Sequence, residues 1–219
     1  MRAADATPIA GLTRGALAER TVATLHRGGG RNPDVLLVDL GDRQVVVKDF
    51  SPRARWLRTT WGRWSLRREL RAYRALAGLD CVPRPLGRLD ALAFVVEYRP
   101  GRRMSRRLAG ELPPGFPARL EAAVRDMHAR GVVHLDLRHR SNVLVDAHGD
   151  PVLIDFASAI CLRPDRWLGR LLLGWLAPID RRAVAKWRQR LTPPAGAGTA
   201  SGAAGATPSE GGRGASRPT

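Results

Sequence analysis

Residues 132–159 of the chain read VVHLDLRHRSNVLVDAHGDPVLIDFASA and hold polar side chains tightly between apolar runs. The apolar runs at 132–133, 142–145 and 152–154 have the composition of short buried strands. Three His, one Asn and several Asp lie in and beside these runs, among them His134, Asp136 and Asn142. A folded core accommodates such side chains when they are hydrogen-bonded or take part in chemistry. The pattern therefore predicts a polar site held between short buried strands.

The remaining pattern is rich in strands before this stretch and in helices around it. Strand and hairpin signals occur at 21–25, 34–50 (with a turn at Gly41-Asp42) and 92–98. Helical periodicity occurs at 65–76, 116–130, 167–175 and 180–191. Pro83 and Pro85 predict an irregular connection over 81–87. We therefore expect an α+β fold of two unlike parts, joined near residues 99–101.

The chain divides by composition into three segments. Residues 1–20 form an N-terminal segment, and residues 21–192 carry the regular pattern of a folded domain. The last segment, 193–219, consists of Gly, Ala, Pro, Ser and Thr apart from one Glu and two Arg. Because such a segment buries too little apolar surface to offset its ordering entropy, we expect it to be disordered.

The charge is strongly positive and comes almost entirely from arginine. The formal net charge is +17, and of the 37 basic residues only Lys48 and Lys186 are lysine. An arginine-rich proteome explains this skew, and so does attraction to a nucleotide, a nucleic acid or an acidic lipid surface. No nucleic-acid motif or aromatic stacking platform is present, so nucleic acid ranks last among these partners.

The cysteines and the apolar runs predict a cytoplasmic protein. Cys81 and Cys161 form no spacing motif, as expected for a reducing compartment. The start of the sequence lacks the apolar run of a signal peptide, and the run 171–178 is too short to span a bilayer. A peripheral contact with the inner membrane remains the alternative location.

Several chemistry-bearing residues follow one another in a definite order. They are Lys48 at the end of VVVK, Glu69 in a helix, Asp136 and Asn142 in the polar loop, and Asp155 after the last strand. In this order the chain resembles the protein-kinase-like superfamily, over roughly residues 21–158. It is most similar to the small bacterial branches of RIO type and lipopolysaccharide-kinase type. The resemblance implies a small antiparallel-sheet lobe (about 21–98) and a reduced, mainly helical lobe (about 102–192).

The resemblance assigns roles to the polar loop. Asp136, in HLDL, matches the residue that accepts or positions the proton of the acceptor hydroxyl. Asn142 and Asp155 match the two magnesium ligands. His134 is expected to hold the loop by hydrogen bonds. Alone, an Asp in a loop is usually a turn former, but three such residues in this order favour a catalytic site.

The resemblance also implies an ATP site in the first half of the chain. Lys48 would bind the phosphates, Glu69 would orient Lys48, and the backbone of Glu97 and Tyr98 would face the adenine. The glycines 28–30 (Gly28, Gly29 and Gly30) lie near the place of the phosphate loop. Simpler alternatives stay open: a solvated Lys48, a surface Glu69 among arginines, a plain core strand at 94–98 and an ordinary flexible turn at the glycines.

The sequence departs from the family pattern at several points. Leu135 replaces the Arg that couples the catalytic loop to activation in many kinases. The loop from Asp136 to Asn142 is one residue longer, so Arg138 and Arg140 could point into the cleft. Ala157 replaces the Gly of D-F-G, and neither a G-x-G-x-x-G loop nor an A-P-E segment is present.

The predicted activity is magnesium- and ATP-dependent phosphoryl transfer to a hydroxyl. A Ser or Thr of a protein is the first candidate acceptor, as in serine/threonine-protein kinases of RIO type. A lipopolysaccharide sugar or a lipid headgroup is the alternative. A nucleotide-binding pseudokinase or scaffold is the alternative from a different class, motivated by the poor glycine loop.

Two tryptophan-rich stretches remain outside this scheme. Trp56, Trp61 and Trp64 alternate with arginines, and Trp167 and Trp175 lie in a leucine-rich run. Indole rings beside guanidinium groups suit a membrane interface. Packing within the fold is the expectation for both groups, more strongly for the later pair, with an anionic membrane as the alternative for the first.

Overall fold

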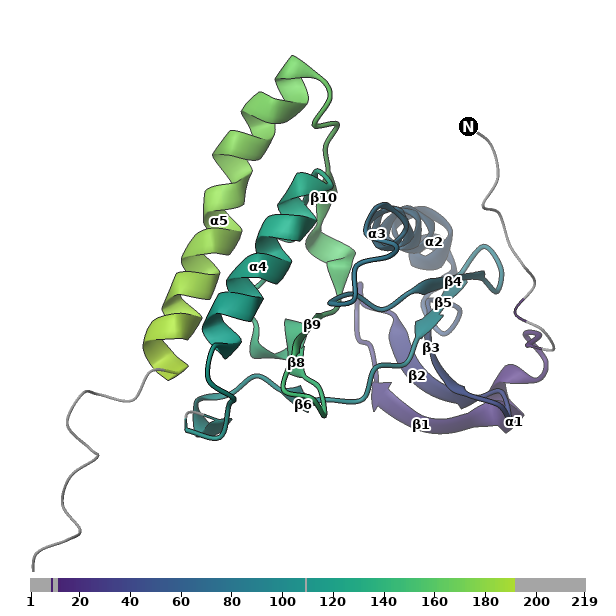
Figure 1. The fold of residues 1–219 in the computed structure, drawn as a ribbon. Coiled ribbons are helices and arrows are strands. Elements are labelled where there is room, and N and C mark those ends of the chain that lie inside the picture. Colours follow the sequence, from purple (N-terminus) through teal and green to yellow (C-terminus); the bar gives the residue numbers. More distant parts are fainter. Residues whose placement is uncertain (1–8, 10–11, 109, 192–219) are drawn as a thin grey trace, which may run out of the picture.

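The computed structural model describes residues 9, 12–108 and 110–191, and it is an α+β structure (Figure 1). A five-stranded antiparallel sheet with its helices occupies residues 12–97, and a mainly helical part occupies residues 102–191. The expected disordered tail 193–219 and residues 1–8, 10 and 11 of the N-terminal segment lie outside the described residues. Among the described residues, no helix is both long enough and apolar enough to cross a membrane.

The large sheet has the strand order β1-β2-β3-β5-β4, with all neighbours antiparallel. Its strands are β1 (Thr21–His26), β2 (Asp34–Asp39), β3 (Gln44–Asp49), β4 (Pro85–Arg88) and β5 (Ala93–Glu97). The predicted hairpin and the strands flanking it are confirmed. The prediction of an irregular connection at 81–87 is wrong for its second half, because β4 begins there. Pro85 is tolerated as the first residue of an edge strand, where its missing N–H leaves no ladder bond unmade.

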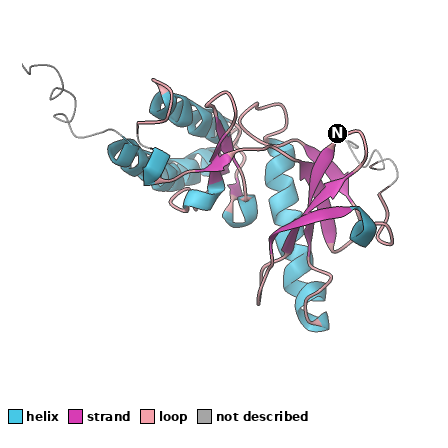
Figure 2. Cartoon of the chain, turned by 90° about the horizontal axis from the view of Figure 1, so that it is seen from below, coloured by secondary structure: helices cyan, strands magenta, loops and turns pink. Residues whose placement is uncertain are grey.

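Helix α3 (Arg63–Ala75) lies beside the sheet (Figure 2), and its apolar stripe is buried in the core cluster that includes sheet residues. The predicted side chains, Leu66, Leu70, Tyr73 and Leu76, are all buried. A short helix α2 (Arg55–Leu57) and a π-helical turn (Arg58–Gly62) lead into α3. Gly62 passes close to Phe50, since a Cβ at Gly62 would lie 2.9 Å from the Phe50 ring. The absence of a side chain there lets the helix start against β3.

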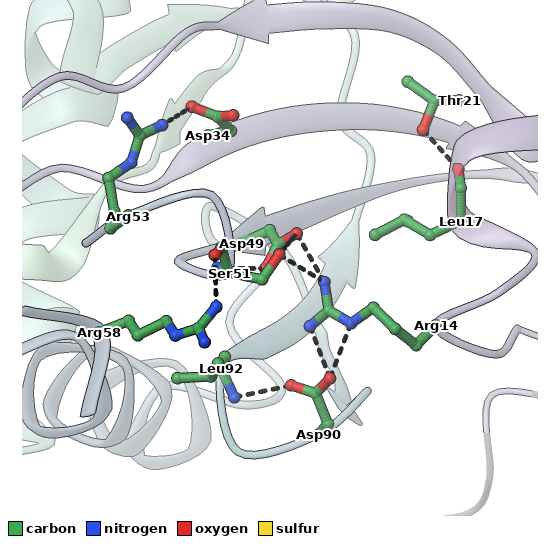
Figure 3. A network of polar contacts seen from close by, with 10 residues as sticks. All are labelled: Arg14, Leu17, Thr21, Asp34, Asp49, Ser51, Arg53, Arg58, Asp90 and Leu92. Carbon is green, nitrogen blue, oxygen red and sulfur yellow. Dashed lines mark hydrogen bonds and ion pairs between the residues drawn. The ribbon is translucent and has the colours of Figure 1, made fainter. Parts of the chain in front are cut away.

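The residues before β1 also pack on this sheet. Leu12 and Leu17, the latter at the start of helix α1 (Leu17–Arg20), belong to a buried cluster on the sheet. Figure 3 shows Arg14 joining Asp49 at the end of β3 to Asp90 in the β4–β5 turn, with an Nη–Oδ separation of 2.6 Å to each. Residues 12–20 are therefore part of the folded structure.

The second part of the chain consists of two long helices and three short turns of 3₁₀ helix around small sheets. Helix α4 (Phe116–Ala129) precedes β7 (Val132–Val133), which pairs with β10 (Ile160–Cys161). A three-stranded sheet has the order β6-β8-β9, from Arg102–Arg103, Val143–Val145 and Pro151–Leu153. The 3₁₀ turns are Arg106–Leu108, Arg140–Asn142 and Phe156–Ser158. The predicted buried runs of residues 132–159 are thus confirmed as strands.

Helix α5 (Trp167–Leu191) lies beside α4 (Figure 1). The prediction of two separate final helices is wrong, because α5 is continuous through Pro178. Proline in a helix interior leaves the carbonyl four residues earlier without its N–H partner. That carbonyl belongs to Gly174, which is exposed, so water can bind it. The predicted face of Val184, Trp187 and Leu191 is buried, as expected.

The expectation that the tryptophans pack inside the fold is wrong for most of them. Trp167 and Trp175 are 74% and 77% exposed, and Trp56 is 68% exposed. Trp61 and Trp64 pack against each other, with ring centroids 5.0 Å apart, but both stay in contact with solvent. Neither stretch therefore belongs to the core.

Candidate active site

Lys48 lies at the centre of a charge cluster that joins the two parts of the chain. It points from β3 and donates hydrogen bonds to Glu69 Oε1 of α3, at 2.5 Å, and to Asp155 Oδ1 after β9, at 2.8 Å. Glu69 is 1% exposed and Lys48 is 7% exposed. The alternatives of a solvated lysine and a surface glutamate are therefore wrong.

Burial and charge act in opposite directions on this cluster. Burial alone lowers the pKa of Lys48, but the carboxylates of Asp155 and Glu69 outweigh it and hold that pKa above its ordinary value. Burial raises the pKa of Glu69, and the ammonium of Lys48 opposes this rise. The same ammonium lowers the pKa of Asp155. Lys48 is thus a fixed cation and Asp155 a fixed anion at neutral pH.

Asp155 adopts a strained backbone conformation that several contacts maintain. Its φ of 64° is unusual for a residue with a side chain. Its N–H donates a hydrogen bond to the Tyr73 hydroxyl of α3, at 3.2 Å. The next residue, Phe156, is fully buried and packs edge-on against Tyr73, with centroids 5.0 Å apart. Helix α3 therefore positions Asp155 from two directions.

Asp136 and Asn142 face each other across the loop that precedes β8. The Asn142 side-chain amide donates hydrogen bonds to the Asp136 carbonyl, at 2.9 Å, and to Asp136 Oδ2, at 3.0 Å. The N–H of Ile154 binds the Asn142 carbonyl, at 3.0 Å, which joins the end of β9 to this loop. The one-residue-longer loop thus still brings its Asp and its Asn into contact.

Asp180 of α5 binds the backbone at the start of the loop that carries Asp136. The sequence alone did not identify Asp180 as a site residue. The carboxylate of Asp180 is fully buried and accepts the N–H groups of His134, at 2.7 Å, and Leu135, at 2.8 Å. His128 Nε2 lies 3.0 Å from the same carboxylate. Leu135 has a φ of 67°, a conformation that these two hydrogen bonds stabilise. The one signal in the sequence was that Asp180 is the single acid in the final helical run.

His134 has the structural role expected of it. Its Nε2–H donates to the Ile154 carbonyl, at 3.0 Å, and its ring packs against Phe156 with centroids 4.8 Å apart. The side chain is fully buried, and burial lowers its pKa. The ring therefore stays neutral at pH 7 and links the loop to the end of β9.

A cavity of about 370 Å³ opens between the sheet and this loop. Five of the predicted site residues line it: Lys48, Glu97, Tyr98, Asn142 and Asp155. Apolar walls come mainly from the sheet strands, and Ile154 and Leu144 close the opposite side. A volume of this size with few, converging polar groups is typical of small-molecule sites.

Three predicted nucleotide contacts have other neighbours in the structure. Gly28, Gly29 and Gly30 form the turn between β1 and β2, where the Gly28 N–H binds Asp34 Oδ1 at 2.8 Å. They are not among the residues that line the cavity, whereas Leu25 and His26 of β1 are. Gly28 has no room for a side chain, because a Cβ would lie 2.2 Å from the Pro33 carbonyl oxygen.

The side chain of Glu97 points toward β4. Its Oε2 accepts the Arg84 N–H at 3.1 Å, and its own N–H binds the Arg84 carbonyl at 2.9 Å. Glu97 therefore contributes a fixed backbone to the cavity wall.

The oxygen donors near the loop fit a magnesium ion. Asp155 accepts a hydrogen bond from Lys48 with Oδ1, and its side chain is 48% exposed and lines the cavity. The amide oxygen of Asn142 has a hydroxyl, Ser141 Oγ, as its partner at 3.1 Å. Magnesium prefers such hard oxygen ligands and usually takes only one or two from the protein, the others coming from phosphates and water. Among the described residues, no three His, Cys, Asp or Glu side chains gather as a separate metal centre.

Arg138 and Arg140 do not line the central cavity. They border a hollow on the far side of the loop, together with Lys186 and Arg190 of α5. A second hollow next to it is lined by Arg103, Arg106 and Arg107 as well as Arg140 and Arg190. The surface beside the candidate catalytic loop is therefore strongly cationic.

Comparison with known proteins finds a similarity over part of the chain. No family model matches the chain. The chain is 34% identical over 150 residues to a protein named "Probable SapB synthase" from Streptomyces coelicolor (strain ATCC BAA-471 / A3(2) / M145). The match covers 58% of this chain and only 16% of that relative, which is a much longer protein.

Proposed function

We propose that the chain is an ATP- and magnesium-dependent phosphotransferase with a hydroxyl acceptor and a two-lobed, protein-kinase-like fold. The observation that carries the proposal is the Lys48 cluster. A buried lysine, paired with a helix glutamate and a strand-end aspartate, lines one cavity together with Asn142, whose amide binds Asp136. Phosphoryl transfer requires this combination of a fixed cation, oxygen ligands and a proton acceptor. The similarity to a protein named a synthase supports an enzymatic role and leaves the reaction open.

Each residue has a task in this proposal. Lys48 binds phosphate oxygens of ATP, and Glu69 keeps its ammonium aimed at the cavity. The backbone at Glu97 and Tyr98 faces the adenine. Asp136 accepts or orients the proton of the attacking hydroxyl, while Asn142 holds the Asp136 side chain in place.

Asn142 and Asp155 would hold the magnesium ion, which neutralises charge on the transferring phosphoryl group. Burial of the surrounding chain restricts water, which strengthens each of these electrostatic contacts. A Ser or Thr of a protein is the first acceptor class that we propose, and a sugar or lipid headgroup is the alternative.

A second candidate is nucleotide binding without transfer. It is favoured by the glycines 28–30, which do not line the cavity and so provide no phosphate loop. The presence of Asp136 and Asn142 in contact argues for transfer instead.

The test is transfer of radiolabelled γ-phosphate from ATP by the full chain, with a mixture of protein, glycolipid and phospholipid acceptors. We expect Asp136→Asn and Asp155→Asn to lower the rate by roughly a hundredfold or more, because each removes a group that acts in the transition state. Asp165→Asn serves as the matched control, since Asp165 is exposed and lies outside the cavity.

The results separate the candidates. Equal rates of phosphate transfer in wild type, Asp136→Asn and Asp155→Asn would overturn the proposal that the chain is a phosphotransferase. Saturable ATP binding without any transfer, weakened by Lys48→Met, would instead support the nucleotide-binding scaffold.

A further inference from the structure

Helix α5 presents one stripe to solvent that changes from apolar to cationic along its length. Side chains three or four residues apart share a helix face, and the buried face of α5 is the opposite one, with Ala177, Val184 and Trp187. We call this exposed face the α5 stripe. Its members are the exposed residues Trp167, Leu171, Trp175, Ile179, Arg182 and Lys186, and the half-buried Arg190, whose guanidinium lies over the Trp187 ring.

The first half of the stripe is a large apolar surface in water. The exposed fractions of Trp167, Leu171, Trp175 and Ile179 are 74%, 50%, 77% and 39%, and the adjacent Leu168 and Leu172 are also exposed. Figure 1 shows that the first turns of α5 extend past the end of α4. A contiguous patch of this kind on a folded protein marks an interaction surface.

The second half of the stripe is cationic and reaches the candidate catalytic loop. Lys186 and Arg190 line the hollow that also holds Arg138 and Arg140. The single acidic residue of α5, Asp180, is fully buried and binds backbone N–H groups. The exposed face of α5 therefore carries no negative charge.

We propose that the α5 stripe docks the protein on an anionic lipid bilayer. Tryptophan and leucine side chains would enter the boundary between headgroups and acyl chains, and Arg182, Lys186 and Arg190 would contact anionic headgroups. A second copy of the chain fits the stripe less well. A symmetric pairing of α5 with α5 could cover the apolar half, but it supplies no carboxylate for the three cations.

This docking goes beyond the proposed phosphotransferase and does not depend on it. The stripe and the Lys48 cluster share no residue, so loss of one leaves the other intact. If both hold, docking brings the loop that carries Asp136 toward the headgroups, because Arg138 and Arg140 border the same hollow as the stripe.

The experiment is co-sedimentation of the full chain with large vesicles, either of phosphatidylcholine alone or of phosphatidylcholine mixed equally with phosphatidylglycerol. We expect binding to the anionic vesicles that weakens with added salt, and little binding to the neutral ones. Trp167→Ser combined with Trp175→Ser should reduce the partition coefficient at least about tenfold. Arg182→Gln combined with Lys186→Gln should reduce it on anionic vesicles only.

Trp56→Ser is the matched control, because it removes an indole of similar exposure, 68%, from another part of the chain. It should leave vesicle binding unchanged. Circular dichroism melts should be the same for all variants, since every substituted side chain is exposed.

Three results would overturn the proposal. The first is that the wild-type chain does not bind anionic vesicles. The second is that Trp56→Ser weakens vesicle binding as much as the combined Trp167→Ser and Trp175→Ser variant does. The third is a dimer in sedimentation velocity that the combined Trp167→Ser and Trp175→Ser variant converts to monomer. The last would assign the stripe to a second copy.

Discussion

Two buried carboxylates organise the candidate site, and they do so through different partners. Glu69 pairs with the ammonium of Lys48, so that two side chains satisfy each other. Asp180 accepts two backbone N–H groups, those of His134 and Leu135. A pair of side chains can be exchanged together for apolar ones, whereas a backbone N–H is lost only when its residue is replaced by proline. The Lys48 pair can therefore be replaced by apolar side chains more readily than Asp180 can.

The largest expected effect is at Asp180. Asp180→Leu should lower the free energy of unfolding by roughly 4 kcal/mol, since two buried N–H groups lose a charged acceptor. Chemical denaturation followed by circular dichroism measures this. A loss below about 1 kcal/mol would mean that water or another group accepts the N–H groups of His134 and Leu135. Asp180 would then be as replaceable as Glu69.

The next effect is at Lys48. Lys48→Met should lower the free energy of unfolding by roughly 3 kcal/mol, because it leaves Glu69 buried without its cation. Adding Glu69→Leu should restore a substantial part of that loss while activity stays absent. A double variant less stable than Lys48→Met alone would show that the pair contributes more than charge compensation.

A smaller, pH-dependent effect is expected at His134. Burial lowers its folded-state pKa below the ordinary value of 6.5, so the unfolded chain binds the proton first as the pH falls. Its contribution to stability is complete above pH 6.5 and decreases as the pH falls below that value. Unfolding curves should therefore show that, between pH 7 and pH 5, the free energy of unfolding decreases less for His134→Gln than for wild type. A parallel decrease in both proteins would contradict a neutral, buried His134.

The smallest effect is expected at Leu135. Its φ of 67° favours glycine, but its side chain is half-buried. Leu135→Gly should change the free energy of unfolding by less than about 1 kcal/mol, as relief of strain offsets lost contacts and greater chain entropy. When Asp180→Leu is already present, Leu135→Gly should increase the free energy of unfolding more than it does in wild type. The reason is that the N–H hydrogen bonds that hold the strained conformation are already lost. Additive effects in a double-mutant cycle would show that Asp180 does not maintain this conformation.

The sequence by itself determined much of the local structure and most of the candidate residues. Period-3.6 patterns located α3 and α4, each of which buries one face, and β-branched or apolar runs located β1–β3 and β5. Lys48, Glu69, Asp136, Asn142 and Asp155 were identified from their order and their neighbours, and the structure brings Lys48 into contact with Glu69 and Asp155, and Asp136 into contact with Asn142. Local rules failed where proline was decisive, at Pro85 and Pro178. Pro85 lies at the start of an edge strand, where its missing N–H costs no ladder hydrogen bond. Pro178 leaves only an exposed carbonyl, that of Gly174, without an N–H partner.

Only the tertiary structure decided how the elements support one another. Asp180 is 44 residues from Asp136 in sequence, so no local pattern could assign it to the loop that contains that residue. The exposure of Trp167 and Trp175 depends on where α4 ends relative to α5, which helical periodicity does not specify. Patterns along a chain report which face of an element is apolar, whereas burial depends on which other element covers that face.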